Sequence, residues 1–219
     1  MAKISTIACV ILVVGLLVAE HKDKAALKAV TKISASLAFI ATGIFKGGLD
    51  WGRFGQLVIV GLVLGAIGDA ALLSKVKKPF LAGIGAFLFS HIAYIAAFVV
   101  LQPSWTGVGA ALVVLVPVAF LIRRWIGDGA GSLGPAVTGY VVVITAMVAC
   151  SVGALAAAIN PHRIVLFAAA VLFFVSDICV ARERFVAPGF ANRLVGLPLY
   201  YGAQLLFAWS VAVVGLARG

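Results

Sequence analysis

Two aspartates stand alone inside apolar segments of helix length, and they are the residues of this chain best suited to chemistry. Asp69 lies in the segment Leu62–Leu73 and Asp177 in the segment Phe173–Ala181, although the whole chain has only seven acidic residues. A carboxylate near a bilayer centre costs roughly 2.5–3.5 kcal/mol on insertion scales, and such a residue usually has a function inside a helix bundle. A carboxyl group away from water favours its neutral form, which makes it a usable acid at neutral pH. Asp69 and Asp177 are therefore candidate catalytic residues.

The composition places these aspartates in a membrane protein. Of the 219 residues, 64% are hydrophobic and 11% are charged, and the mean hydropathy is +1.20. A soluble domain of this composition would expose too much apolar surface. Long continuous apolar runs exclude a transmembrane barrel, whose strands alternate with period two. The sequence predicts an all-α fold, a polytopic transmembrane bundle of about eight helices that forms one domain over residues 1–219.

Eight apolar segments are predicted to be helices, several of them near the ~20-residue spanning length. They are Ile4–Ala19, Val30–Phe45, Phe54–Leu73, Phe80–Leu101, Val108–Ile122, Leu133–Ile159, Ile164–Ala181 and Leu194–Ala217. Residues 1–19 have the pattern of a cleavable signal peptide. We expect them to be retained as the first span, because Lys22, Lys24 and Lys28 directly follow the apolar core and resist translocation. The glycine-rich break Arg123–Ser132 is expected to be a flexible connection.

The net charge of +10 is distributed over short loops and does not form one patch. This distribution indicates positive-inside topology and excludes a nucleic-acid partner. With eight spans and Lys32 set aside as intramembrane, eleven basic residues lie on one side and five on the other. The richer side is expected to be cytoplasmic, with both termini outside, and the membrane to be the plasma (inner) membrane if the source is bacterial. The eleven are Lys22, Lys24, Lys28, Lys75, Lys77, Lys78, Arg123, Arg124, Arg182, Arg184 and Arg193. The five are Lys3, Lys46, Arg53, Arg163 and Arg218.

Helix order also predicts that the intramembrane polar residues share one half of the membrane. The predicted helices that carry Asp69 and Asp177 both run toward the basic side, and each aspartate lies about one turn before the helix end. At a rise of 1.5 Å per residue, both lie roughly 6 Å inside the helix ends. The other polar residues in this half are Lys32, His91, Tyr200, Tyr201 and Gln204. Because unrelated polar residues would scatter over both halves, we interpret these residues as one site.

A structural interpretation stays open for each of these residues. Either aspartate can belong to a buried ion pair with Lys32 or Arg184. Lys32 can extend its amine to the headgroups, Tyr200 can be an interfacial anchor, and Ser176 can bond to its own helix backbone.

Two helix faces have the same ambiguity between site and packing. Gly61 and Gly65 precede Asp69 at intervals of four residues and predict close helix packing. One face of the fourth predicted helix, which suits either a bundle core or a site wall, carries Phe87, His91, Tyr94 and Phe98.

The polar residues fall within segments that, taken in order, resemble one family. The segments are Thr31-Lys32, Gly68–Leu73, Phe80–Tyr94, Leu172–Phe185 and Tyr200–Gln204. In these segments the chain resembles the YhhN-type lysoplasmalogenases, which are multi-helix membrane proteins of bacteria and animals. Ile33 stands where the family pattern often has a proline after the lysine.

The resemblance implies hydrolysis of the vinyl ether bond of a lysoplasmalogen, a membrane lysophospholipid, to a fatty aldehyde and a glycerophospho-alcohol. It implies Asp69 and Asp177 as the catalytic residues. The implied substrate-binding residues are Lys32, His91, Tyr94, Ser176, Tyr200, Tyr201 and Gln204.

The candidate residues suit this reaction on chemical grounds. An acid must protonate the alkene carbon, and water must then capture an oxocarbenium-like cation, so one carboxylic acid and one carboxylate suffice, as in glycosidases. No metal or other cofactor is expected, because His91 is the only histidine well inside a predicted helix. We expect the site to open toward the cytoplasmic leaflet and to continue into an apolar slot lined partly by Phe87, Phe98 and Phe173.

Two other functional classes remain open from the sequence. Intramembrane aspartates also serve as proton relays in transporters, although no pair of broken midplane helices or inverted repeat is evident here. A non-catalytic lipid-binding protein would not need the aspartates. Aldehyde release from a lysoplasmalogen separates these classes.

Overall fold

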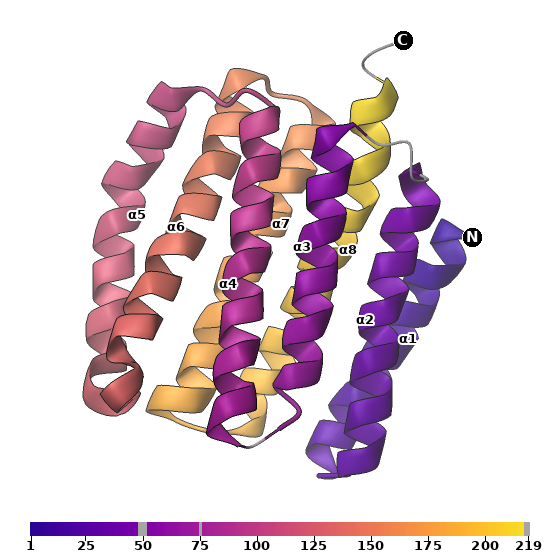
Figure 1. Ribbon diagram of the computed structural model, residues 1–219, viewed down its shortest axis with the longest axis vertical. Helices are drawn as coiled ribbons and strands as arrows, with labels where there is room; N and C mark the ends of the chain where they lie inside the picture. The colour runs from indigo at the N-terminus through magenta and orange to yellow at the C-terminus, as the bar shows by residue number, and fades with distance from the viewer. Residues whose placement is uncertain (48–51, 75, 217–219) are drawn as a thin grey trace.

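Eight α-helices run up and down through the computed structural model (Figure 1). The structure describes residues 1–47, 52–74 and 76–216, and these residues contain no strand, so the predicted all-α class with about eight helices is confirmed. A 3₁₀ segment, η1 (Gly127–Leu133), connects α5 to α6, and a π-helical turn, η2 (Arg182–Val186), follows α7. The helices are α1 (Ala2–His21), α2 (Ala25–Gly47), α3 (Arg53–Ala71), α4 (Lys77–Val100), α5 (Trp105–Ile126), α6 (Gly134–Ala157), α7 (Pro161–Ala181) and α8 (Phe190–Leu216).

Local sequence signals set several helix ends. The Ser104 side chain accepts a hydrogen bond from Gly107 N at 3.2 Å at the start of α5. Asn160 does the same for Arg163 N at 2.9 Å before α7, where a proline takes the first helical position. These are preferred residues at those places because they satisfy or remove backbone donors that have no partner inside the helix. At the end of α5, Gly127 has a φ of 54°, which glycine adopts without steric cost.

The helices α5 and α6 form a hairpin. The apolar helical stretch Trp105–Ala157 contains 53 residues. As one straight helix it would be roughly 80 Å long, far more than the ~30 Å hydrocarbon core of a bilayer. The chain turns back at η1, where Arg123 Nη1 donates to Gly127 O at 3.1 Å. The segment Arg123–Ser132, expected to be a flexible connection, consists of the last turn of α5 and most of η1.

The described residues include seven continuous helical stretches that are long and apolar enough to cross a membrane. One of them is the α5–α6 hairpin, which supplies two helices of the bundle. The chain is an integral, multi-pass membrane protein. The outward faces of its helices expose large apolar side chains, as a lipid-facing surface requires; on α5 these are Val113, Val114, Val116, Phe120 and Leu121.

Long-range packing places α8 in the centre of one half of the molecule. It contacts α1, α2, α3 and α7, while α4 contacts both α3 and α6. In Figure 1 the α1–α2 pair and the α5–α6 pair lie at opposite sides of the bundle. The N-terminal end of α1 and the C-terminal end of α8 lie at the same end of the molecule (Figure 1). The opposite end therefore holds the α1–α2, α3–α4, α5–α6 and α7–α8 connections.

The helices extend further than their apolar runs indicate. The predicted segments Ile4–Ala19, Val30–Phe45 and Val108–Ile122 correspond to helices of 20, 23 and 22 residues. Polar residues continue these helices because their side chains find partners there: Lys28 of α2 pairs with Glu20 of α1 at 2.9 Å. The predicted helix Leu194–Ala217 begins earlier, at Phe190. Its predicted last residue lies outside the described residues.

Candidate active site

A cavity of about 380 Å³ lies at the end of the bundle where α7 ends and α8 begins, and residues from all eight helices line it. This volume is within the usual range for small-molecule sites. Asp69 and Asp177 both line it. Two carboxyl groups on helices distant in sequence thus reach one cavity.

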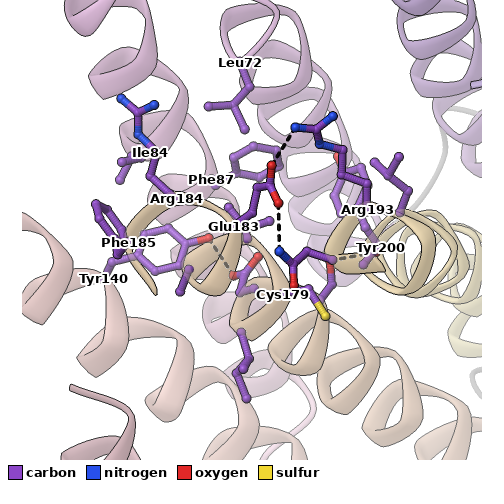
Figure 2. A pocket seen from close by; sticks show the side chains of 18 of the residues that line it. Leu72, Ile84, Phe87, Tyr140, Cys179, Glu183, Arg184, Phe185, Arg193 and Tyr200 are labelled. Atoms are coloured by element: carbon purple, nitrogen blue, oxygen red, sulfur yellow. Dashed lines mark hydrogen bonds and ion pairs between the residues drawn. The ribbon is translucent and has the colours of Figure 1, made fainter. Parts of the chain in front are cut away.

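The cavity walls are largely apolar. On α6, Val137, Tyr140, Val141 and Ile144 recur at intervals of three and four residues, so they share one helix face, and all four line the cavity. The neighbouring helix α4 contributes Phe80, Ile84 and Phe87 to the lining. Figure 2 shows Ile84, Phe87 and Tyr140 converging on this space. Apolar walls with a few polar groups suit a ligand that has a hydrocarbon chain.

Asp69 is the more enclosed of the two carboxyl groups, and both of its oxygens have donors. Its side chain is 2% exposed, and Oδ1 lies 3.2 Å from Lys32 Nζ. Oδ2 accepts hydrogen bonds from Ser36 Oγ and from the Tyr200 hydroxyl, each at 2.7 Å. One cation and two hydroxyl donors are the surroundings expected for an ionised carboxylate, since burying an unpaired charge is costly.

A further layer of buried polar side chains holds the Asp69 donors in place. Gln204 Nε2 donates to the Tyr200 hydroxyl at 3.2 Å, and Tyr94 donates to Gln204 Oε1 at 2.6 Å. The Tyr201 hydroxyl donates to the backbone oxygen of Lys32 at 3.2 Å. These residues therefore orient the partners of Asp69.

Glycines on α3 make room for this polar layer. A Cβ added at Gly65 would clash with Gln204 Nε2 and would lie 3.2 Å from the Tyr200 hydroxyl. A Cβ added at Gly61 would clash with the Tyr94 ring. The close packing predicted from the glycine spacing is thus a packing of α3 against the side chains that support Asp69.

Asp177 has a different set of partners. Its Oδ2 accepts a hydrogen bond from the Tyr140 hydroxyl at 2.7 Å (Figure 2) and lies 3.1 Å from His91 Nε2. The Tyr140 hydroxyl is itself 2.9 Å from His91 Nε2. Among the described residues no hydrogen bond or ion pair reaches Asp177 Oδ1, and the side chain is 16% exposed. Asp177 is therefore the more accessible carboxyl group of the cavity.

The surroundings of His91 fix its tautomer. Nδ1 is buried and has no hydrogen-bond partner among the described residues, whereas Nε2 faces Tyr140 and Asp177. A proton on Nδ1 would be an unsatisfied buried donor. We therefore place a hydrogen on Nε2, which makes His91 a donor to the Tyr140–Asp177 pair.

An aromatic contact links the two polar clusters. The Phe173 ring lies 4.6 Å from the His91 ring and 5.3 Å from the Tyr200 ring, measured between centroids. Both contacts are edge-to-face, an arrangement that aromatic pairs favour. The rings fix the spacing of the clusters without connecting them by hydrogen bonds.

Charged residues cross-link the rim of the cavity. Arg193 joins Glu20 at 3.1 Å and Glu183 at 2.6 Å, and Figure 2 shows the second contact. Glu183 Oε2 also accepts from Asn192 Nδ2 at 2.8 Å. This network ties the end of α1 to η2 and to the start of α8.

Most of the chain matches a known protein family. The match covers residues 27–211, and the family is the YhhN family. The chain belongs to the YhhN family.

Two relatives have names that state an activity. A lysoplasmalogenase TMEM86A of Bos taurus is 31% identical over 158 residues, which cover 70% of this chain and 64% of the relative. A lysoplasmalogenase TMEM86A of Homo sapiens is 30% identical over 156 residues, with the same coverage. The chain thus spans 64% of the length of these curated relatives. No solved structure matches the chain.

In this YhhN-family protein the candidate residues occupy two layers. Lys32, Ser176 and Tyr200 line the cavity together with the two aspartates. The others lie behind the lining and are at most 1% exposed; they are His91, Tyr94, Tyr201 and Gln204. Ser176 does not bond to its own helix, because its hydroxyl donates to Gly196 O of α8 at 3.0 Å.

The expected slot has partly different walls. Phe87 lines the cavity as expected, but Phe98 and Phe173 do not. Both are 1% exposed or less and belong to the core of the bundle. They were assigned to the slot by hydrophobicity alone, which cannot separate a core face from a cavity face.

Sequence reasoning missed Tyr140 and Ser36. Tyr140 lies in a long apolar run, and its place in the stripe with Val137, Val141 and Ile144 was the available signal. Ser36 lies one helical turn after Lys32, so both face the same neighbour on α3. That spacing was the corresponding signal for Ser36.

Proposed function

We propose that this protein hydrolyses the vinyl ether bond of a lysoplasmalogen, releasing a fatty aldehyde and a glycerophospho-alcohol. The names of the relatives support the substrate class. The observation that carries the chemistry is the pair of differently held carboxyl groups in one largely apolar cavity.

Asp177 is the proposed acid. Its Oδ2 accepts from Tyr140 and faces His91 Nε2, which leaves Oδ1 to carry a proton toward the cavity. Transfer of that proton to the alkene carbon forms a C–H bond from the π electrons and leaves an oxocarbenium cation at the ether carbon. General acid catalysis of this kind contributes roughly 10²–10⁴-fold to a rate.

Asp69 is the proposed ionised partner. Its carboxylate, held by Lys32, Ser36 and Tyr200, supplies negative charge to the cavity in which the cation forms. Charge held in place before the reaction stabilises such a transition state without reorganisation.

Water then completes the reaction. It adds to the cation and returns one proton to the Asp177 carboxylate, which restores the acid. The resulting hemiacetal separates into the aldehyde and the glycerol hydroxyl. One carboxyl group thus serves as acid and then as base, as in retaining glycosidases.

The lining of the cavity supports a single-chain lipid. Apolar side chains of α4 and α6 suit the hydrocarbon chain, and the charged rim lies at the end of the bundle where a headgroup would lie. We propose that this end faces the cytoplasmic leaflet, from the eleven-to-five distribution of basic residues. Reporter fusions at both termini test the orientation, and fusions active only in the cytoplasm would contradict it.

The direct test uses purified protein in a detergent without phosphate groups. A vinyl ether lysophospholipid should yield an aldehyde, trapped as its hydrazone, whereas the saturated ether analogue should yield none. Absence of aldehyde from the vinyl ether substrate, with binding of that lipid retained, would contradict hydrolysis and indicate a lipid-binding or transport protein.

A further inference from the structure

We propose that Arg184 anchors the phosphate of the lysophospholipid headgroup at the rim of the cavity. This inference rests on the proposed function, because it assigns one part of the substrate to one residue of the site. The ligand class is a single-chain lipid with a phosphodiester.

The first argument is the pairing of the basic residues that line the cavity. Lys28 pairs with Glu20 at 2.9 Å, Lys32 with Asp69 at 3.2 Å, and Arg193 with Glu183 at 2.6 Å. Arg184 also lines the cavity, but no carboxylate pairs with it among the described residues. It is the lining cation whose charge the described protein residues do not neutralise.

The second argument is the contact of its guanidinium group. The guanidinium carbon of Arg184 lies 4.2 Å from the centre of the Phe80 ring, and both residues line the cavity. This cation–π interaction holds the group at the cavity without using its N–H donors, and among the described residues no acceptor takes a hydrogen bond from them. A planar fork of donors matches two phosphate oxygens, and such bidentate contacts are among the strongest hydrogen bonds in proteins.

The third argument is the position of Arg184 relative to the proposed acid. It follows Asp177 by seven residues, which is roughly 10 Å along a helix axis. Figure 2 shows it beside Ile84, on the same side of the cavity as Tyr140, the hydrogen-bond partner of Asp177. A phosphate at Arg184 would therefore lie nearer the end of the bundle than a vinyl ether at Asp177, as a headgroup requires.

A binding measurement tests this assignment independently of turnover. The ligands are a saturated-ether lysophospholipid, which has the phosphate but cannot be hydrolysed, and a 1-O-alkylglycerol of equal chain length, which lacks the phosphate. The protein is full-length, in phosphate-free detergent, as wild type, Arg184→Gln, Arg184→Lys and the control Arg124→Gln. Arg124 is exposed and does not line the cavity, so its substitution removes the same charge outside the site.

Arg184→Gln should weaken binding of the lysophospholipid about tenfold to a hundredfold and leave binding of the alkylglycerol unchanged. Arg184→Lys should fall between wild type and Arg184→Gln, because a lysine keeps the charge and loses the planar fork. Arg124→Gln should match wild type. If Arg184→Gln weakens binding of both ligands equally, or if Arg124→Gln weakens lysophospholipid binding as much as Arg184→Gln does, the assignment is overturned. Either result would indicate a general attraction of the protein surface for lipid.

A turnover measurement separates this inference from the proposed reaction. With a vinyl ether lysophospholipid, Arg184→Gln should raise KM and keep kcat within a few-fold of wild type, as expected for a contact made equally in ground and transition states. If wild type releases no aldehyde but shows the expected difference in binding, the phosphate site stands and the reaction does not. If aldehyde is released and binding is insensitive to Arg184, the reaction stands and the phosphate site does not.

Discussion

The surroundings of Asp69 and of Asp177 differ in how many donors reach the carboxyl group and in what charge those donors carry. Asp69 receives a lysine ammonium and two hydroxyl groups, which occupy both of its oxygens. Asp177 receives a tyrosine and a histidine on one oxygen. The first arrangement suits the proposed ionised partner, and the second suits the proposed acid. The comparison teaches that two carboxyl groups of one cavity can differ in the donors that hold them, and this difference is the basis of the two proposed roles.

Removal of the transferable proton should have the largest effect on turnover. Asp177→Asn keeps the shape and one acceptor of the side chain, so turnover should fall by roughly 10²–10⁴-fold while lipid binding and thermal stability stay near wild type. Asp69→Asn should also abolish most turnover. Because the two residues act as a unit, the double variant should be scarcely slower than Asp177→Asn. Aldehyde release near the wild-type rate from either variant would return that aspartate to a structural role.

Loss of the Lys32–Asp69 ion pair should destabilise the protein, and only a change at Asp69 should reverse that loss. Lys32→Met leaves the Asp69 charge buried without its cation, which should destabilise the fold by about 3–5 kcal/mol. Adding Asp69→Asn removes that charge and should restore most of the lost stability. Thermal unfolding in detergent provides the measurement. Asp177→Asn should give no such rescue of Lys32→Met, and an equal rescue by both substitutions would contradict the pairing.

A side chain added at a glycine of α3 should disturb the residues that hold Asp69. Gly65→Ala places a methyl group against Gln204 and the Tyr200 hydroxyl, so it should destabilise the protein by about 1–3 kcal/mol and slow turnover. The control is Gly85→Ala on α4, where an added Cβ meets nothing within 4 Å. That control should leave turnover unchanged, and it should leave the unfolding temperature unchanged or slightly raised. A stability loss in Gly85→Ala equal to that in Gly65→Ala would show that the α3 position is not special.

Removal of a single hydroxyl donor to either aspartate should have the smallest effect on turnover. Tyr140→Phe removes one of two donors to Asp177, and Tyr200→Phe removes one of three donors to Asp69. Each should reduce turnover about tenfold, as expected for one hydrogen bond to a charged or reacting group. Tyr200→Phe should also lower the unfolding temperature, because Gln204 Nε2 then loses its acceptor. A lower unfolding temperature in Tyr140→Phe together with an unchanged one in Tyr200→Phe would contradict the layered arrangement around Asp69.

The fold and the location of the site were accessible from the sequence for different reasons. Apolar runs of helix length are sufficient to predict a helical bundle, since each helix satisfies its own backbone hydrogen bonds in lipid. Asp69 and Asp177 could be recognised because a carboxyl group in such a run is costly. The two open suggestions for an ion-pair partner, Lys32 and Arg184, could not be separated, and only Lys32 pairs with Asp69.

The arrangement of partners could not be predicted because it depends on which helices are neighbours. Hydropathy locates each helix along the chain but does not give its place in the bundle. The contacts of α4 and α6 bring His91 and Tyr140 to Asp177, and the contacts of α2, α3 and α8 surround Asp69. The face that Tyr94 shares with His91 was compatible with a bundle core or a site wall, and Tyr94 donates to Gln204 in the buried layer. A shared face indicates that side chains point together, but not whether they meet a cavity or a neighbouring helix.

Deuterium transfer from solvent tests the central claim most directly, since protonation of the alkene carbon by a carboxylic acid in equilibrium with water is the proposed slow step. The purified protein is given a vinyl ether lysophospholipid in D₂O, and the trapped aldehyde is analysed by mass spectrometry together with the rate in H₂O and D₂O. The account predicts one deuterium on the carbon next to the aldehyde, slower turnover in D₂O, and loss of this product in Asp177→Asn. Aldehyde without deuterium at that carbon, or an undiminished rate of labelled product from Asp177→Asn, would contradict it.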